Sequence, residues 1–198
     1  MGHDISWTAA SEFLRNPLMV GSAFPATKRM VAHMLDPLDW PNIRLLVEYV
    51  PGTGCFTFEA LRRLGPDATL IAIEAGRGFV EALRAHNSDP RLFIVEDAAR
   101  HVRRFLAAHG HDRADCILTG LPFSTLTPGD AVKLMRETAR ALEPAGTLPA
   151  YQMRSAIRPL LERNFASVEK GYEWFNIPPC HLYRARQSIA DGGDRDAG

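Results

Sequence analysis

The sequence predicts an α/β fold: a mostly parallel sheet of seven strands, with helices on both faces and an antiparallel pair of strands at its C-terminal end. Short runs rich in Ile, Leu and Val alternate with longer helical patterns, as is typical of a parallel sheet buried on both faces. The last two apolar runs are joined across the short segment "NIPPC", which favours an antiparallel pair. With 198 residues and 46% hydrophobic content, the chain is long enough for one sizeable core.

The predicted elements follow one another without internal repeats. Strands are expected at residues 43–49, 69–74, 91–95, 114–119, 146–152, 165–174 and 180–187, and helices at about 54–64, 76–86, 97–109, 129–142 and 153–163. Pro128 marks the start of the fourth of these helices, and "EPAG" marks its end. We expect residues 1–20 to form a short amphipathic helix, 21–187 to form the main domain and 188–198 to be a disordered tail.

The composition narrows the possible partners and compartment. The 23 basic and 23 acidic residues cancel, so no global field attracts nucleic acid or an anionic membrane. Three widely spaced cysteines indicate reduced thiols, and the histidines at 101, 109 and 111 lack the accompanying ligands of a metal site, so no metal is expected. No apolar run reaches the ~18 residues of a spanning helix and no signal peptide is visible, which predicts a cytoplasmic protein.

The segment "VEYVPGTG" ends the first predicted strand and leads into a helix. Ligands of parallel sheets bind beyond the carboxyl ends of the strands. Gly52 and Gly54 allow the backbone to approach a ligand closely, and the amides at the start of the helix offer hydrogen-bond donors. Val50 stands where a third glycine is common, and a β-branched residue is strained there if the position needs a positive φ.

Acidic residues end three successive strands and indicate the kind of ligand. Glu74 can accept both hydroxyls of a ribose, and Asp97 can accept an adenine amino group. Together with Glu48 they disfavour a phosphate-rich dinucleotide and suit a cationic nucleoside without phosphate. A dinucleotide-dependent dehydrogenase, the competing enzyme class, needs a strict G-x-G-x-x-G that the chain lacks.

In these features the chain resembles the class I S-adenosylmethionine-dependent methyltransferases, with their Rossmann-like fold, over about residues 20–187. The resemblance implies S-adenosylmethionine as cofactor and S-adenosylhomocysteine as product. The cofactor-binding residues that it implies are Glu48, Tyr49, Pro51, Gly52, Thr53, Gly54, Glu74, Ala75, Asp97, Ala98, Gly120 and Leu121. Val50, Ala145 and Pro149 depart from the family pattern, Pro149 because it lies inside a predicted central strand.

The tetrapeptide "GLPF", residues 120–123, follows the fourth strand, where the methyl acceptor is expected. Ribosomal RNA adenine dimethyltransferases, which the chain also resembles, have Asn at the position of Gly120 to bind the base amine. Their helical RNA-binding region and basic surface are missing here. The segments 13–34, 142–152 and 175–186 instead resemble bacterial phospholipid N-methyltransferases, although "PAT" (25–27) replaces a common Pro-Ser-Ser.

This second resemblance implies stepwise methylation of phosphatidylethanolamine towards phosphatidylcholine by a peripheral protein on the inner face of the cytoplasmic membrane. A primary ammonium has no free lone pair, so a base or a desolvating pocket must assist. Candidate bases are Tyr151, His181 and Tyr183, with Glu173 as a weaker candidate, and candidate cation–π walls are Phe123, Tyr49 and Trp174. Candidate contacts to the lipid or membrane are Trp7, Phe13, Arg15, Lys28, Arg154 and Arg158.

Three alternatives remain open from the sequence: an RNA adenine N6-methyltransferase, a small-amine methyltransferase, and a methyltransferase-like protein that binds lipid or cofactor with little turnover. No nucleic-acid partner is expected, because no basic RNA-binding region is present. The number of methyl transfers and the oligomeric state stay open.

Overall fold

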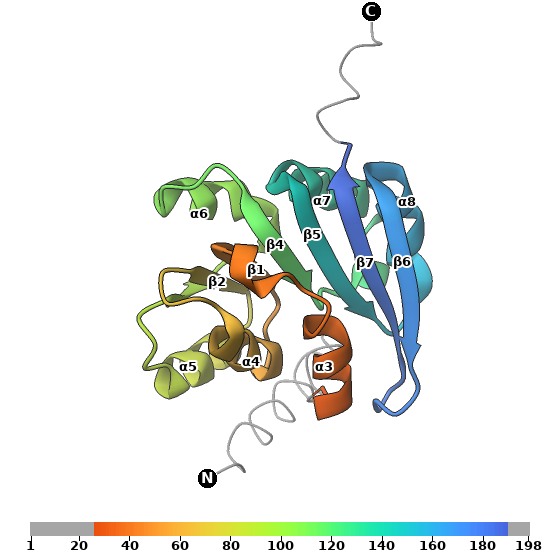
Figure 1. Ribbon diagram of the computed structural model, residues 1–198. Coiled ribbons are helices and arrows are strands. Elements are labelled where there is room, and N and C mark those ends of the chain that lie inside the picture. Colours follow the sequence, from red (N-terminus) through yellow and green to blue (C-terminus); the bar gives the residue numbers. More distant parts are fainter. Residues whose placement is uncertain (1–25, 190–198) are drawn as a thin grey trace, which may run out of the picture.

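The computed structural model describes residues 26–189, which form one mixed sheet covered by helices (Figure 1). The seven strands have the order β3-β2-β1-β4-β5-β7-β6, in which β7 is antiparallel to both of its neighbours and all other pairs are parallel. Their bounds are β1 Leu45–Tyr49, β2 Thr69–Glu74, β3 Leu92–Glu96, β4 Ala114–Thr119, β5 Leu142–Gln152, β6 Phe165–Glu173 and β7 Cys180–Ser188. The predicted fold class is therefore confirmed.

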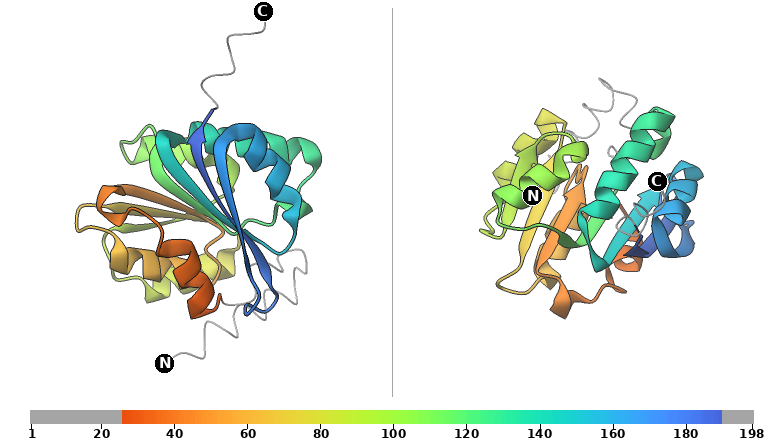
Figure 2. Two further views of the ribbon diagram at one scale, coloured as in Figure 1. Left: turned by 45° about the vertical axis from the view of Figure 1, so that its right-hand side comes forward. Right: turned by 90° about the horizontal axis from the view of Figure 1, so that it is seen from above.

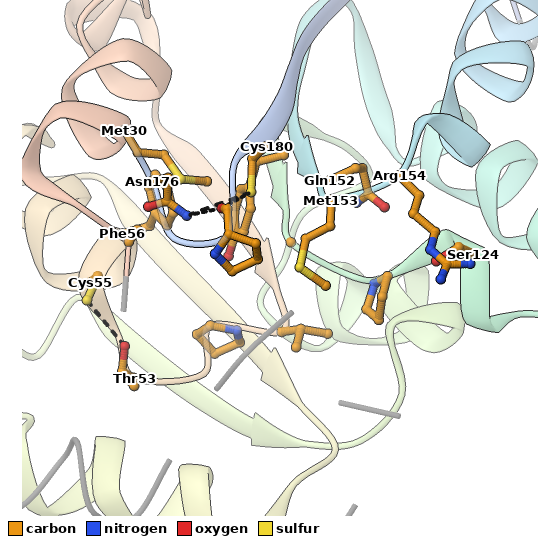
Figure 3. Close-up of a pocket in the computed structure, with 17 residues that line it drawn as sticks. Met30, Thr53, Cys55, Phe56, Ser124, Gln152, Met153, Arg154, Asn176 and Cys180 are labelled. Atoms are coloured by element: carbon orange, nitrogen blue, oxygen red, sulfur yellow. Dashed lines mark hydrogen bonds between the residues drawn. The ribbon is translucent and has the colours of Figure 1, made fainter. Parts of the chain in front are cut away.

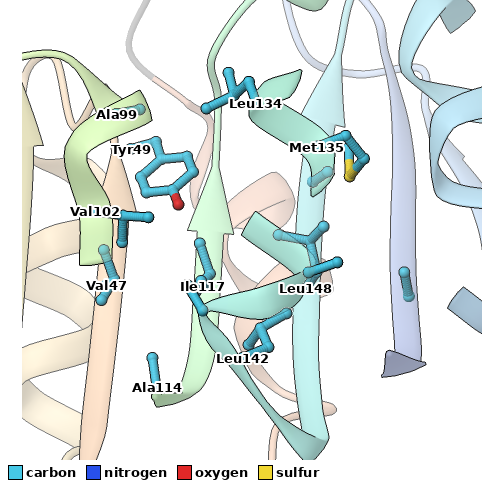
Figure 4. Packing of buried hydrophobic residues seen from close by; sticks show 14 of the residues in the cluster. Val47, Tyr49, Ala99, Val102, Ala114, Ile117, Leu134, Met135, Leu142 and Leu148 are labelled. Atoms are coloured by element: carbon cyan, nitrogen blue, oxygen red, sulfur yellow. The ribbon is translucent and has the colours of Figure 1, made fainter. Parts of the chain in front are cut away.

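Helices lie on both sides of the sheet (Figure 2). They are α3 Lys28–Leu35, α4 Cys55–Arg63, α5 Arg77–His86, α6 Val102–Ala108, α7 Pro128–Arg140 and α8 Arg158–Asn164. Short 3-10 turns are η2 Trp40–Asn42, η3 Ala99–His101, η4 Phe123–Thr125 and η5 Ser155–Ile157. Buried side chains of α3 and α4 form one core cluster with the sheet, while those of α6, α7 and α8 form a second cluster on the opposite face (Figure 4).

Two elements, helix α3 and strand β5, differ from the sequence prediction. The helix α3 was not predicted as an element, although Thr27 caps it by accepting a hydrogen bond from the Met30 amide at 3.2 Å. Strand β5 begins at Leu142 rather than near 146, and its register against β4 shifts between Ala114 and Cys116. This irregularity accommodates Pro144, whereas Pro149 lies beyond it, opposite Arg184 of β7. The predicted N-terminal helix and most of the predicted tail lie outside the described residues.

The strand order reverses between β1 and β4, and the loops that follow these two strands meet there. The Gly120 amide, just after β4, donates to the carbonyl of Tyr49 at 3.3 Å, and the Val50 amide donates to the carbonyl of Ile73 at 2.9 Å. These bonds hold the ends of β2, β1 and β4 together at one edge of the sheet. This is the edge at which open α/β sheets bind ligands.

Candidate functional site

The loop between β1 and α4 has a positive φ at Val50, the condition under which the sequence analysis expected strain. Val50 has φ 57°, and Gly52 and Gly54 have φ 55° and 79°. Glycine adopts such angles without steric cost, whereas the branched Cβ of valine crowds its own backbone. The first residue of the loop is therefore left-handed although it is valine and not glycine. The side chain of Val50 packs against the core on the α6–α8 face, and this packing offsets the backbone strain.

Glu48 is the most unusual carboxyl group of the site. Its side chain is buried, and its Oε2 accepts a hydrogen bond from the Thr57 hydroxyl at 2.6 Å. Its Oε1 is buried without a hydrogen-bond partner among the described residues. Burial raises the pKa of Glu48 to about 8, and the nearby negative charge of Glu74 adds to this effect. A buried acceptor of this kind suits a positively charged ligand group.

Glu74 joins two loops at the end of β2. Its Oε2 accepts the amide of Gly52 at 3.1 Å, and its Oε1 accepts the amide of Gly76 at 2.8 Å. The carboxylate thus fixes the glycine loop after β1 to the turn after β2. A carboxylate oxygen can accept more than one hydrogen bond.

Asp97 follows β3 and is only partly buried. Its Oδ1 accepts the amide of Ala98 at 2.6 Å and lies 2.9 Å from Nδ1 of His101. The hydrogen bond from the Ala98 amide, followed by that from His101, lowers the pKa of Asp97. Asp97 therefore keeps its charge at the same edge at which Glu48 and Glu74 lie.

The remaining residues of the predicted cofactor set lie on loops at this edge, with one exception. Pro51, Thr53 and Gly54 lie in the loop after β1, Ala75 follows β2, Ala98 follows β3, and Gly120 and Leu121 follow β4. The exception is Tyr49, whose ring is fully buried in the core on the α6–α8 face (Figure 4). The Thr138 hydroxyl lies 3.3 Å from the Tyr49 hydroxyl, so the Tyr49 side chain does not face a ligand.

A pocket next to this edge is built around Tyr151, the penultimate residue of β5. The Tyr151 ring stacks on Phe56, with ring centroids 4.8 Å apart. A Cβ added to Gly120 would collide with the Tyr151 hydroxyl and would lie 2.8 Å from a ring carbon. The phenol of Tyr151 thus fills the space in which a side chain at position 120 would lie, and Gly120 is required by that packing.

The pocket is lined by five separate parts of the chain, one of which is the loop after β4 (Figure 3). Met30 comes from α3, Phe56 from α4, Met153 and Arg154 from the residues directly after β5, and Asn176 from the turn between β6 and β7. Most of these side chains are apolar. Burial raises the pKa of Tyr151 well above its ordinary value, and the negative charge of Glu48 adds to this effect. Tyr151 therefore keeps its proton at neutral pH.

Several predicted acceptor residues are not brought to this pocket. His181 lies opposite Gln152 on β5, one residue after Tyr151, so it projects from the other face of the sheet and contacts the ring of Tyr172 at 4.8 Å. Tyr183 is on the same face as His181 and is buried in the core. Phe123 is also buried in the core rather than exposed to a substrate.

The two other candidates lie at the turn between β6 and β7. The Glu173 carboxylate is buried, with Nδ1 of His33 at 2.7 Å and Nε of Arg29 at 3.3 Å, so it is not placed as a base for the pocket. Trp174 is 72% exposed and packs on the ring of Tyr172 at 4.3 Å, so it does not line the pocket either.

The predicted lipid contacts are spread over different parts of the surface. Arg154 is exposed and lines the pocket, and Lys28 is exposed at the first position of α3. Arg158 lies at the start of α8, where its Nε is 2.9 Å from Glu162, and it does not line the pocket. Trp7, Phe13 and Arg15 lie outside the described residues.

Two buried polar residues were missed by the sequence analysis. Gln152 donates to the carbonyl of Leu121 at 2.7 Å and accepts the amide of Phe123 at 3.2 Å, so it shapes the "GLPF" turn. Asn176 accepts the amide of Thr27 at 3.1 Å, across 149 residues of sequence. Both residues lie in the segments 142–152 and 175–186 that carry the family resemblance, but the sequence analysis gave neither of them a role.

Within residues 26–189, no group of three or more His, Cys, Asp or Glu side chains is arranged to hold a metal ion. None of the helices in this range is both long and apolar enough to cross a membrane.

Comparisons with known proteins agree with this geometry. The chain is 27% identical over 177 residues to the ornithine lipid N-methyltransferase of Singulisphaera acidiphila, a match that covers 88% of this chain and 92% of that protein. It is 33% identical over 91 residues to the ribosomal RNA small subunit methyltransferase H of Flavobacterium johnsoniae, a match that covers 46% of this chain and 29% of that protein. No family model matches the chain.

Among solved structures, the N-methyltransferase NodS from Bradyrhizobium japonicum, in complex with S-adenosylhomocysteine, has the same fold. The TM-score is 0.59 at 14% sequence identity, and the match covers 73% of this chain and 78% of that one. Together with the strand order, this likeness gives the chain the class I methyltransferase fold.

Proposed function

We propose that this chain, a class I S-adenosylmethionine-dependent methyltransferase, transfers methyl groups to the amine of a membrane lipid headgroup. The observation that carries the choice of acceptor is the packing of Tyr151 against Gly120. At this position, adenine dimethyltransferases use an Asn side chain to bind a base. Here a phenol takes that space and faces an apolar pocket instead.

The residues at the edge of the sheet fit the cofactor. The orphaned Oε1 of Glu48 is a buried acceptor suited to a positive charge, while Glu74 and Asp97 offer acceptors for a ribose and an adenine amino group. The glycine loop after β1 brings backbone close to the ligand. When bound, the cofactor supplies a sulfonium methyl group that is open to in-line attack by a nucleophile.

The chain's own residues must deliver the amine with a free lone pair. The apolar side chains of the pocket, among them Met30, Phe56 and Met153, disfavour the charged ammonium form and so favour the neutral amine. Tyr151 keeps its proton, so its hydroxyl orients the amine by hydrogen bonding rather than removing a proton as a phenolate. Alignment of this kind supplies several kcal/mol towards such a transfer.

The headgroup is proposed to be an amine that carries a neighbouring anionic group. The similar protein from Singulisphaera acidiphila is named for ornithine lipid, and the resemblance to phospholipid N-methyltransferases suggests phosphatidylethanolamine on its way to phosphatidylcholine. Arg154, exposed where it lines the pocket, can pair with a carboxylate or a phosphate. We take phosphatidylethanolamine as the first acceptor to test and ornithine lipid as the second.

The test supplies methyl-labelled S-adenosylmethionine to the full chain with vesicles of phosphatidylethanolamine, vesicles of ornithine lipid, or ribosomal RNA. Label in either lipid supports the proposal and identifies the headgroup. Label only in RNA overturns it. Calorimetry with S-adenosylhomocysteine shows whether the cofactor site works, so that tight binding without any labelled acceptor also overturns lipid methylation.

A matched pair of variants links the activity to the pocket. Tyr151→Phe removes the hydroxyl but keeps the ring on Phe56, so we expect a loss of kcat with little change in cofactor affinity. Tyr172→Phe removes a hydroxyl from β6, outside the pocket lining, and should leave both unchanged.

A further inference from the structure

The turn between β6 and β7 carries a cluster of exposed apolar side chains. Trp174, Phe175 and Ile177 are 72%, 67% and 76% exposed, within four consecutive residues. Figure 1 shows this turn at the far end of the β6–β7 pair, beside the start of α3. Single exposed apolar residues are ordinary, but a contiguous cluster of large ones indicates a surface that contacts something apolar.

The turn is held in place by buried polar groups. Asn176, only 4% exposed, accepts the Thr27 amide at 3.1 Å and donates to the Pro178 carbonyl at 2.9 Å. The amide of Phe175 donates to Glu173 at 3.0 Å. The apolar side chains are therefore exposed on a turn whose backbone is held by hydrogen bonds.

The rim of this cluster is positively charged. The Arg29 guanidinium lies 4.7 Å from the centre of the Phe175 ring, and its side chain is 58% exposed. Lys28 is also exposed, next to Arg29 on α3, and the exposed Arg154 lies across the pocket from Asn176 (Figure 3). The carboxylate of this region, Glu173, is buried beneath His33 and Arg29. An apolar tip with a cationic rim is complementary to a bilayer that carries anionic lipids.

The same turn forms one wall of the pocket. Asn176, Pro178 and Cys180 line the pocket, and Figure 3 shows Asn176 beside Phe56 and Met30. Their neighbours Trp174, Phe175 and Ile177 are exposed and are not among the lining residues. A surface that receives this tip would lie directly against the pocket mouth. A lipid headgroup could then enter the pocket without leaving the bilayer.

We propose that Trp174, Phe175 and Ile177 insert into the interfacial layer of an anionic bilayer and hold the pocket mouth against it. The role in substrate delivery rests on the proposed lipid methyltransferase function, whereas the insertion itself does not. Tryptophan and phenylalanine are well suited to the headgroup layer because they combine a large apolar surface with limited flexibility. Lys28, Arg29 and Arg154 add attraction to anionic headgroups.

Vesicle binding tests the insertion without an acceptor lipid. The full chain is sedimented with vesicles of phosphatidylcholine and phosphatidylglycerol, neither of which carries a primary amine. Replacing the three residues by serine (Trp174→Ser, Phe175→Ser and Ile177→Ser) should weaken binding by on the order of 100-fold. The control variant Val132→Ser and Ile189→Ser changes apolar residues that are 38% and 47% exposed elsewhere, and should bind like the parent. Equal binding by the triple variant and the parent overturns the proposal.

Fluorescence of Trp174 shows whether the tip is free to insert. In a Trp7→Phe and Trp40→Phe background, Trp174 is the remaining tryptophan of the chain. Anionic vesicles should shift its emission to shorter wavelength, and brominated lipids should quench it. Emission that is already blue-shifted without vesicles would mean that residues 1–25 or a second copy of the chain covers the tip, and would overturn the proposal.

Activity on two forms of one lipid separates this inference from the proposed function. On vesicles that contain phosphatidylethanolamine, the triple variant should lose most of its activity. On a short-chain phosphatidylethanolamine dissolved as monomers, it should match the parent. If the parent binds vesicles through the tip but labels no lipid in either form, the proposed function fails and the insertion stands. If the triple variant methylates both forms like the parent, the delivery role fails and lipid methylation stands.

Discussion

The two halves of the sheet's carboxyl edge are held together in different ways. On the cofactor side, most of the carboxylate hydrogen bonds described join residues close in sequence: Asp97 to the next amide, Glu74 to an amide two residues on, and Glu48 to Thr57 nine residues on. The longest of them runs 22 residues, from the Gly52 amide to Glu74. On the acceptor side, Gln152 reaches back 31 residues to Leu121, and Asn176 reaches back 149 residues to Thr27. The cofactor side is thus built from local turns, and the acceptor side from the packing of distant strands.

This difference predicts which kind of substitution affects each side of the edge most. Local hydrogen bonds between a carboxylate and backbone amides respond to charge and backbone conformation. Packing between distant segments responds to side-chain volume. Changes of volume should therefore affect the acceptor side most, whereas changes of pH or of backbone freedom should affect the cofactor side.

The largest effect is expected for Gly120→Ala on the acceptor side. The new Cβ collides with the hydroxyl of Tyr151, whose ring is stacked on Phe56, so we expect the free energy of unfolding to fall by about 3 kcal/mol. Urea denaturation measures this change. Gly65→Ala is the control, because a Cβ at Gly65 meets nothing within 4 Å, and it should be nearly neutral.

A second substitution distinguishes a collision from a backbone effect. Adding Tyr151→Ala to Gly120→Ala removes the atoms that the new Cβ meets. The combined loss of stability should then be clearly smaller than the sum of the two single losses. Additive losses would show that Tyr151 is not what restricts position 120.

A smaller effect, dependent on pH, is expected for Glu48→Gln on the cofactor side. The pKa of Glu48 is about 8 in the folded protein and 4.5 as its ordinary value, so folding favours the protonated form. The stability that Glu48 contributes is fully present below pH 4.5 and is lost as the pH rises through about 8. Glutamine stays neutral and can still accept from Thr57.

Thermal unfolding at several pH values measures this difference. Glu48→Gln should match the parent near pH 4.5 and should be more stable by ~2 kcal/mol near pH 6. Asp115→Asn is a useful comparison, because Asp115 also accepts backbone amides but at the exposed opposite edge of the sheet, from Arg44 at 2.8 Å. A pH-independent difference for Glu48→Gln would mean that the carboxyl group is already hydrated or paired in solution.

The same division explains how much could be predicted from the sequence. The strands and the carboxylates at their ends were predicted, because each depends on a few neighbouring residues. The positive φ at Val50 was considered only as a condition, and the structure shows that it is met. The acceptor side was predicted only in part. His181 was placed with Tyr151, yet the register of β7 against β5 pairs it with Gln152, and a shift of one residue reverses the face of a strand.

The positions of Phe123 and Gly120 also depend on contacts between distant strands, which the sequence alone does not reveal. The tetrapeptide "GLPF" locates the turn, but whether Phe123 faces the substrate or the core depends on how Gln152 holds the turn from a strand 29 residues on. The absence of a side chain at Gly120 was read as a lost ligand for a base. Its physical cause, the hydroxyl of Tyr151, appears only when β4 and β5 are brought together.

The smallest effect is expected for Val50→Gly, which probes the backbone of the cofactor side. Glycine removes the crowding at φ 57° but also removes the packing of valine against the core, so we expect a net gain in stability of only about 0.5–1 kcal/mol. Gln187→Gly is a matched control, because Gln187 has φ 59° in β7, away from the site. Both variants should be slightly more stable in urea, but only Val50→Gly should change the affinity for S-adenosylhomocysteine in calorimetry, because only Val50 precedes the loop whose Gly52 amide is held by Glu74. If Val50→Gly instead loses more than ~1 kcal/mol, the packing of valine outweighs its strain, and the cofactor side depends on side-chain volume as the acceptor side does.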